Sequence, residues 1–123
     1  MTTVYLYANA ALYLLFAIVC TLKYTDTAQS LGYTQLANAG RSEYLVIYGG
    51  LQAGLAVFFA LAARDPSWRS AGLALALSLY VPIVLYRWIT IARFAPGGLT
   101  MGVAALETVL LVWGLVVAWA AWR

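Results

Sequence analysis

The sequence predicts an all-α membrane protein, an antiparallel bundle of four transmembrane helices in one domain that covers residues 1–123. Three observations predict this fold. Hydrophobic residues make up 65% of the chain and charged residues 9%, against about 45–50% and about 25% in typical soluble domains. The apolar residues form four runs, each near the ~20 residues that a helix needs to cross a bilayer. Turns rich in charge, proline or glycine separate the last three runs.

The predicted helices span residues 4–22, 43–63, 70–92 and 100–122. The second helix ends before residues 64–67 (Arg-Asp-Pro-Ser), where two charges meet a proline that an interior helical turn would not accept. The third ends before residues 95–98 (Ala-Pro-Gly-Gly), a plain turn signal. Because both connections are short, helices two, three and four should be antiparallel neighbours. The first connection, residues 23–42, is longer and polar, with room for a short interfacial helix.

The charged residues and the cysteine content exclude several classes of protein. Seven Lys and Arg stand against four Asp and Glu, a net charge of +3. These cations are scattered rather than gathered on one polar face, which argues against nucleic-acid binding and fits loops near anionic lipid headgroups. With one cysteine and no histidine, the chain can form neither an internal disulfide nor a Cys/His metal site. We therefore predict no metal and no cofactor.

The basic residues divide evenly between the two sides of the predicted bundle. One side carries Arg64, Arg69 and Arg123, and the other carries Lys23, Arg41 and Arg93. The positive-inside rule gives most weight to short loops next to the helices, and residues 64–69 form the most compact basic loop. We therefore predict that both termini are cytoplasmic and that the protein lies in a bacterial inner membrane.

One charged residue, Arg87, lies inside an apolar run at residues 79–90. Such a charge costs ~3 kcal/mol on membrane-insertion scales, so Arg87 needs a partner. Arg87 should lie roughly 9 Å from the end of the third helix, and Glu107 roughly 10 Å from the start of the fourth, on the same side of the membrane. Glu107 is therefore the predicted partner. Glu43, which begins the second helix on that side, could take a second bond from the same guanidinium.

This predicted pair has two interpretations. It could be a structural ion pair that fixes how the helices align. It could also be part of a functional site, because ionisable residues inside membranes are functional candidates by default. On the functional interpretation, the candidate catalytic residues are Glu107, Arg87 and Glu43.

Tyrosines and two amides form further stripes along the predicted helices. Tyr44, Tyr48 and Gln52 recur at every fourth position of the second helix, and Tyr5, Asn9 and Tyr13 do the same on the first. Aromatic walls with a few polar groups are typical of small-molecule pockets, and equally of a core whose hydroxyl groups are all hydrogen-bonded. The candidate ligand-binding residues are Tyr48, Gln52, Tyr80, Asn9, Tyr13 and Tyr44.

Gly50 and Gly54 have the Gly-x-x-x-Gly spacing that lets two helix backbones approach closely. Glu43 and Ile47 share their face. The spacing predicts close packing inside the bundle or, as the alternative, a contact between two copies of the chain.

Several of these features together resemble a widespread bacterial family of small four-helix integral membrane proteins whose function is uncharacterised. They are Arg41-x-Glu43, Tyr48-Gly49-Gly50-x-Gln52-x-Gly54, Ala62-Ala63-Arg64, Arg87 and Ala105-Leu106-Glu107. The resemblance covers almost the whole chain. It implies a four-helix membrane fold and implies no activity.

Three functions from different classes are consistent with these residues. The first is a binding or structural protein whose polar site takes a lipophilic molecule or a protein partner. The second is a membrane-embedded enzyme acting on an isoprenoid- or sterol-like substrate, with Glu107 or Glu43 as acid or base and Arg87 or a tyrosine stabilising developing charge. The third is a small proton-coupled transporter that works as a dimer.

Overall fold

The computed structural model describes residues 1–123 as an all-helical chain without strands. Four helical segments are long and apolar enough to cross a membrane. They are Thr2–Leu22, Asn38–Arg64, Pro66–Phe94 and Gly98–Ala121. The predicted all-α class and the four long apolar helices are therefore confirmed.

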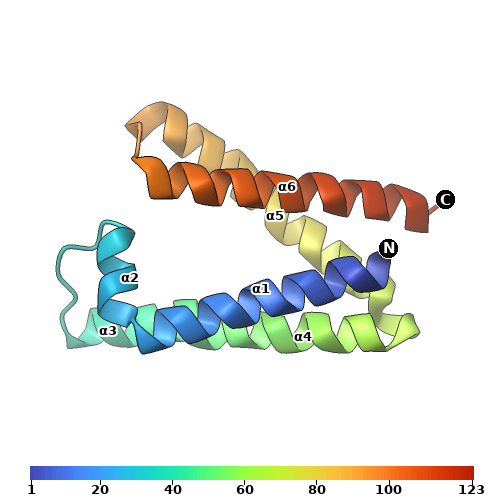
Figure 1. Cartoon of the computed structure of the whole chain (residues 1–123), viewed down its shortest axis with the longest axis horizontal. Helices are drawn as coiled ribbons and strands as arrows, with labels where there is room; N and C mark the ends of the chain where they lie inside the picture. Colours follow the sequence, from blue (N-terminus) through green and yellow to red (C-terminus); the bar gives the residue numbers. More distant parts are fainter.

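The chain contains six α-helices and two shorter helical turns (Figure 1). In order they are α1 Thr2–Leu22, α2 Tyr24–Ser30, α3 Asn38–Leu45, the π-helical turn η1 Val46–Leu51, α4 Gln52–Arg64, the 3₁₀ turn η2 Pro66–Trp68, α5 Arg69–Phe94 and α6 Gly98–Ala121. The short helix in the first connection is α2. The second long helix begins at Asn38, earlier than hydropathy predicts, because polar residues can also form helical turns beyond an apolar run.

The core lies where all four long helices meet. α1 packs along α4, and α5 packs along α6. Each long helix contributes fully buried side chains, which include Tyr5, Leu6, Phe59, Leu73 and Val117. Figure 1 shows both termini and the η2 turn at the same end of the molecule.

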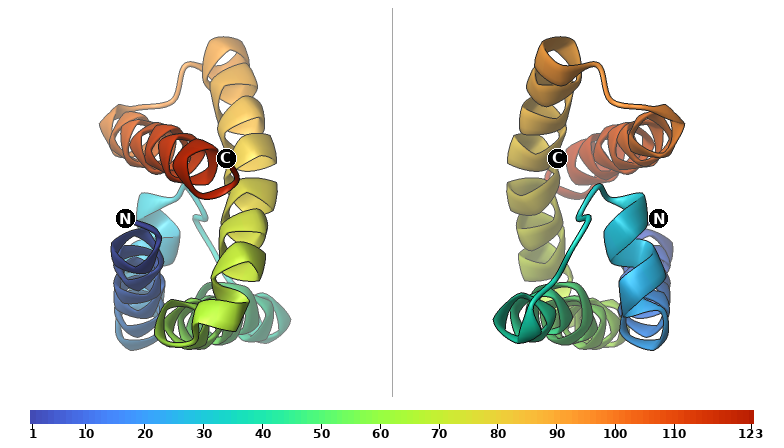
Figure 2. Two further views of the ribbon diagram at one scale, coloured as in Figure 1. Left: turned by 90° about the vertical axis from the view of Figure 1, so that its right-hand side faces the viewer. Right: turned by 90° about the vertical axis from the view of Figure 1, so that its left-hand side faces the viewer.

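The second half of α5 lies outside this core. Figure 2 shows α1, α4 and α6 seen nearly along their axes while α5 crosses obliquely from the α4 side to the α6 side. The last buried residue of α5 is Val84. Beyond it Leu85, Tyr86, Trp88 and Ile89 are exposed. This part of α5 therefore presents an apolar surface to its surroundings.

The turn between α4 and α5 is held by Asp65, whose carboxylate accepts hydrogen bonds from the Ser67 backbone nitrogen at 2.9 Å and from Ser67 Oγ at 2.8 Å. Both bonds favour the charged carboxylate, so they lower the pKa of Asp65 below its usual value.

A small dependence of stability on pH follows from this turn. Because the folded-state pKa is the lower one, the Asp65 bonds stabilise the fold above the unfolded pKa of about 3.9, and this stabilisation is lost as the pH falls through the folded pKa. We expect Asp65→Asn to lose less stability than the wild type on acidification, as measured by thermal unfolding in detergent. Equal losses in the two proteins would contradict this.

Candidate functional site

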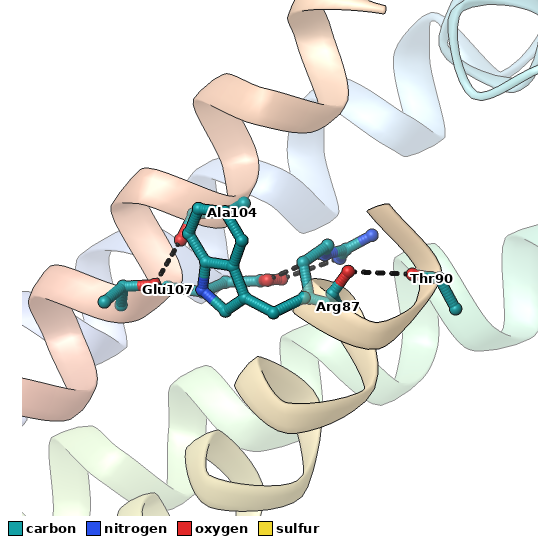
Figure 3. Close-up of polar contacts among 6 residues, drawn as sticks. Arg87, Thr90, Ala104 and Glu107 are labelled. Atoms are coloured by element: carbon teal, nitrogen blue, oxygen red, sulfur yellow. Dashed lines mark hydrogen bonds and ion pairs between the residues drawn. The ribbon is translucent and has the colours of Figure 1, made fainter. Parts of the chain in front are cut away.

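Arg87 and Glu107 form a two-pronged ion pair between α5 and α6 (Figure 3). Arg87 Nε donates to Glu107 Oε2 and Arg87 Nη2 donates to Oε1, both at 2.8 Å. Arg87 lies seven residues before the last residue of α5, and Glu107 nine residues after the first residue of α6. The rise of ~1.5 Å per residue therefore brings them to similar depths across the short turn. The predicted partnership of Arg87 with Glu107 is confirmed.

The ion pair is only partly enclosed. The Arg87 side chain is 32% exposed and the Glu107 side chain 16%. Charge-assisted, two-pronged hydrogen bonds are among the strongest and most directional that side chains make. The pair is therefore rigid, yet reachable from outside the protein.

A second polar link joins α5 to α6 one residue further along each helix. Trp88 Nε1 donates to Thr108 Oγ1 at 3.1 Å, and Thr108 Oγ1 donates to the Ala104 carbonyl at 2.7 Å. Sequence reasoning missed Trp88 and Thr108. Each directly follows a member of the ion pair, so the same depth argument would have found them.

A buried polar network joins α1 to α5 and α6. The Tyr80 hydroxyl donates to Asn9 Oδ1 at 2.6 Å, and Asn9 Nδ2 donates to the Tyr5 carbonyl at 2.8 Å. The Tyr5 hydroxyl donates to the Leu110 carbonyl at 3.2 Å. Asn9 and Tyr80 are 0% and 4% exposed. These two candidate ligand-binding residues therefore lie in a hydrogen-bonded core beside the ion pair, not on an accessible surface.

Breaking this network from one side should be costly. Asn9→Ala leaves the Tyr80 hydroxyl without its acceptor inside the core, which we expect to destabilise the fold by about 1–3 kcal/mol. The double variant Asn9→Leu/Tyr80→Phe removes both partners and should cost less than Asn9→Ala alone. Unfolding curves in detergent measure both effects, with Tyr86→Phe as the control because Tyr86 is exposed on the same helix. A double variant less stable than Asn9→Ala would contradict this.

Two of the predicted tyrosines are half-buried on other helices. Tyr13 of α1 stacks on Phe59 with ring centroids 5.5 Å apart. Tyr48 of η1 stacks on Tyr44 with ring centroids 4.5 Å apart. The ion pair and these two phenols are therefore among the predicted polar groups that stay partly exposed.

The remaining predicted residues lie elsewhere. Tyr44 is buried, donates to Thr27 Oγ1 at 2.9 Å and stacks on Tyr48, so it ties α3 to α2. Gln52 is half-buried in α4. Glu43 is exposed and forms no ion pair, because it lies on the outer face of α3. The second bond from Arg87 to Glu43 is therefore absent.

Gly50 and Gly54 also lie on the outer face. Both are exposed, and a Cβ atom at either would meet no other atom within 4 Å. The close approach to α1 occurs at Gly49 instead, where a Cβ would lie 2.7 Å from Thr21 Oγ1. Close packing of Gly50 and Gly54 inside the bundle is therefore wrong. This long helix is apolar on all sides, so its hydrophobic pattern does not mark which face turns inward.

A contact between two copies through Gly50 and Gly54 stays a prediction. Ile47, Val57 and Leu61 are exposed on the same face. We expect the wild type to be dimeric in mild detergent and Gly50→Leu/Gly54→Leu to be monomeric, because bulky side chains prevent close backbone approach. Light scattering coupled to gel filtration measures the mass. Gly102→Leu is the control, since that glycine is also exposed and faces open space. An unchanged mass of the double variant would show that two copies do not meet through Gly50 and Gly54.

Two surface hollows lie away from the ion pair. One, of about 390 Å³, lies between α2 and the loop that follows it, and its lining includes Tyr24, Tyr33 and Arg41. The other, of about 480 Å³, lies at the η2 turn around Arg64 and Trp68. Neither includes Arg87 or Glu107, so these hollows do not extend the candidate site.

Comparison with known proteins adds no further constraint on the function of this site. No family model, no curated protein and no solved structure matches the chain.

Proposed function

We propose that this chain is an integral membrane protein whose four long helices form an antiparallel transmembrane bundle that binds a lipophilic ligand beside Arg87 and Glu107. The observation that carries the proposal is a two-pronged ion pair, partly exposed, on otherwise apolar helices. Charged groups at such depths are expensive. A purely structural pair would be least costly if the protein enclosed it completely, whereas this pair stays reachable from outside.

The surroundings of the pair support a binding role. Tyr13 and Tyr48 supply half-buried aromatic surface and hydroxyl groups on α1 and η1. The network of Tyr5, Asn9 and Tyr80 forms a buried, hydrogen-bonded base that links α1 to α5 and α6. A few oriented polar groups on an apolar, aromatic wall are typical of sites for small apolar molecules.

The same geometry favours binding over the enzyme and the proton-coupled transporter. Both of those functions need a carboxyl group that exchanges protons during each cycle. Both oxygens of Glu107 accept hydrogen bonds from Arg87. Proton exchange at Glu107 would therefore first require Arg87 to move away.

Lipid analysis of the purified protein tests the binding role. We expect the wild type, extracted into nanodiscs directly from its membrane, to retain a lipophilic molecule that mass spectrometry detects. The double variant Arg87→Met/Glu107→Leu should fold and lose this molecule. Arg93→Met, the same type of change at an exposed position of α5, is the matched control and should retain it. Equal retention of the lipophilic molecule by all three proteins would contradict the proposal.

We also propose a bacterial inner-membrane location with both termini in the cytoplasm. The compact basic turn around Arg64 and Arg69 supports this orientation, because it lies at the same end of the molecule as both termini (Figure 1). Reporter fusions at each terminus, active only on one side of the membrane, test it. Membership of the small four-helix bacterial family stays part of the proposal, supported by the four long apolar helices.

A further inference from the structure

Arg87 holds hydrogen-bond donors that Glu107 does not use. A guanidinium group has five N–H donors. Glu107 accepts from two of them, one on Nε and one on Nη2, which leaves three N–H donors of Arg87 unused. In Figure 3 one guanidinium nitrogen of Arg87 points away from Glu107.

These free donors are accessible. The one buried side-chain nitrogen or oxygen atom without a hydrogen-bond partner is Arg69 Nε. The unused nitrogen of Arg87 is therefore not sealed inside the protein, in agreement with the 32% exposure of its side chain.

The surface around these donors is apolar. Ile83 and Ile91 lie one turn before and one turn after Arg87 on the same face of α5 and are partly exposed, and the neighbouring Trp88 is 44% exposed. Within a bilayer such a surface faces hydrocarbon, where no water is present to accept the hydrogen bonds. An oxygen acceptor on a lipophilic molecule would satisfy the donors while its apolar part covers this surface.

The charge balance of the pair determines which acceptor fits. Arg87 and Glu107 together carry no net charge, because the guanidinium is positive and the carboxylate negative. An anion that approached the free donors would also approach the Glu107 carboxylate, and such like-charge contacts are unfavourable. A carbonyl oxygen accepts the same hydrogen bond without this repulsion.

We propose that the Arg87–Glu107 pair selects lipophilic molecules with an uncharged carbonyl acceptor, such as an ester, ketone or quinone, over lipophilic anions. This inference rests on the proposed binding function and names the ligand class of that same site. Glu107 is here a specificity-determining residue, because its carboxylate neutralises Arg87 and repels anions.

A matched pair of probes tests the preference. Radiolabelled methyl palmitate and pentadecanesulfonate carry alkyl chains of equal length and differ in charge. Both are titrated onto the protein in nanodiscs of ether-linked phosphatidylcholine, which has no ester carbonyl to compete, and binding to empty nanodiscs is subtracted. We expect saturable binding of the ester at one site per chain, at least about tenfold tighter than that of the sulfonate.

Three variants sharpen this result. Glu107→Gln leaves the Arg87 cation without a counter-ion, so it should reverse the preference in favour of the sulfonate. Arg87→Met should abolish binding of both probes, and Arg93→Met should leave both unchanged. If Glu107→Gln does not fold, the comparison of the two probes on the wild type still decides the question.

The outcomes separate the inference from the proposed function. Tighter saturable binding of the sulfonate to the wild type would overturn the ligand class and leave a binding protein. If Arg87→Met does not reduce the saturable binding, the ligand binds elsewhere on the protein. That result would overturn both the ligand class and the proposed binding function of this site. Absence of saturable binding by either probe would likewise overturn both.

Discussion

Glu107→Gln is expected to destabilise the folded protein by about 1.5–3 kcal/mol, the range for hydrogen bonds to a charged group, because the pair is only partly enclosed. The change leaves Arg87 with a neutral partner, and an isolated charge is expensive within the proposed bilayer. Arg87→Met should cost a similar amount, because it leaves the Glu107 carboxylate without its two donors. Unfolding of each variant in detergent measures both values.

The double variant Arg87→Met/Glu107→Leu provides the decisive comparison. It removes both charges and replaces them with apolar side chains, so it should be closer in stability to the wild type than either single variant. The thermodynamic cycle isolates the interaction energy of the pair. Arg93→Met is the control for loss of a cation from α5. Additive single effects, with no recovery in the double variant, would show that the pair does not stabilise the fold.

Gly114→Ala is the second change with a large expected effect. A Cβ at this buried position would lie 2.5 Å from Tyr5 Oη and 3.0 Å from Tyr5 Cζ. Tyr5 cannot easily give way, because it is 0% exposed, packs edge-on against Trp113 and bonds the Leu110 carbonyl. We expect a loss of about 1–3 kcal/mol, the usual cost of overpacking a core. Thermal unfolding in detergent is the measurement.

Two further variants test this steric explanation. Tyr5→Phe removes the hydroxyl group that the new methyl group would meet, so adding it to Gly114→Ala should recover part of the lost stability. Gly102→Ala lies on the same helix, is exposed and meets no atom within 4 Å. It should be neutral or stabilising by up to ~1 kcal/mol, because alanine favours helices more than glycine does. A similar loss at both glycines would argue against the clash with Tyr5.

Depth along a helix was predictable from the sequence, and rotation about the helix axis was not. The pairing of Arg87 with Glu107 follows from the number of residues between each side chain and the turn that joins their helices. The open face at Gly50 and Gly54 does not follow from their spacing. Because the helix that carries them is apolar on every side, Gly49 and Gly50 are equally plausible contact points until the packing is known.

The two interpretations of the tyrosine-rich stripes were likewise separable only in three dimensions. Asn9 and Tyr80 are candidate ligand-binding residues in the sequence, but the structure buries them with a hydrogen bond between their side chains. Tyr13 and Tyr48 belong to the same kind of stripe, and they remain half-buried. Spacing indicates that two residues share a helix face, but it does not show which other helix covers that face.

The sequence by itself determined the all-helical class, the four long apolar helices, and the residue that neutralises Arg87. Hydropathy, helix length and the rise per residue are local properties, so they can be read without knowledge of the packing. Only the tertiary structure decided which polar groups are enclosed and which stay accessible, because that depends on how α5 crosses the other helices. The accessible donors of Arg87, on which the proposed ligand class rests, belong to this second kind of information.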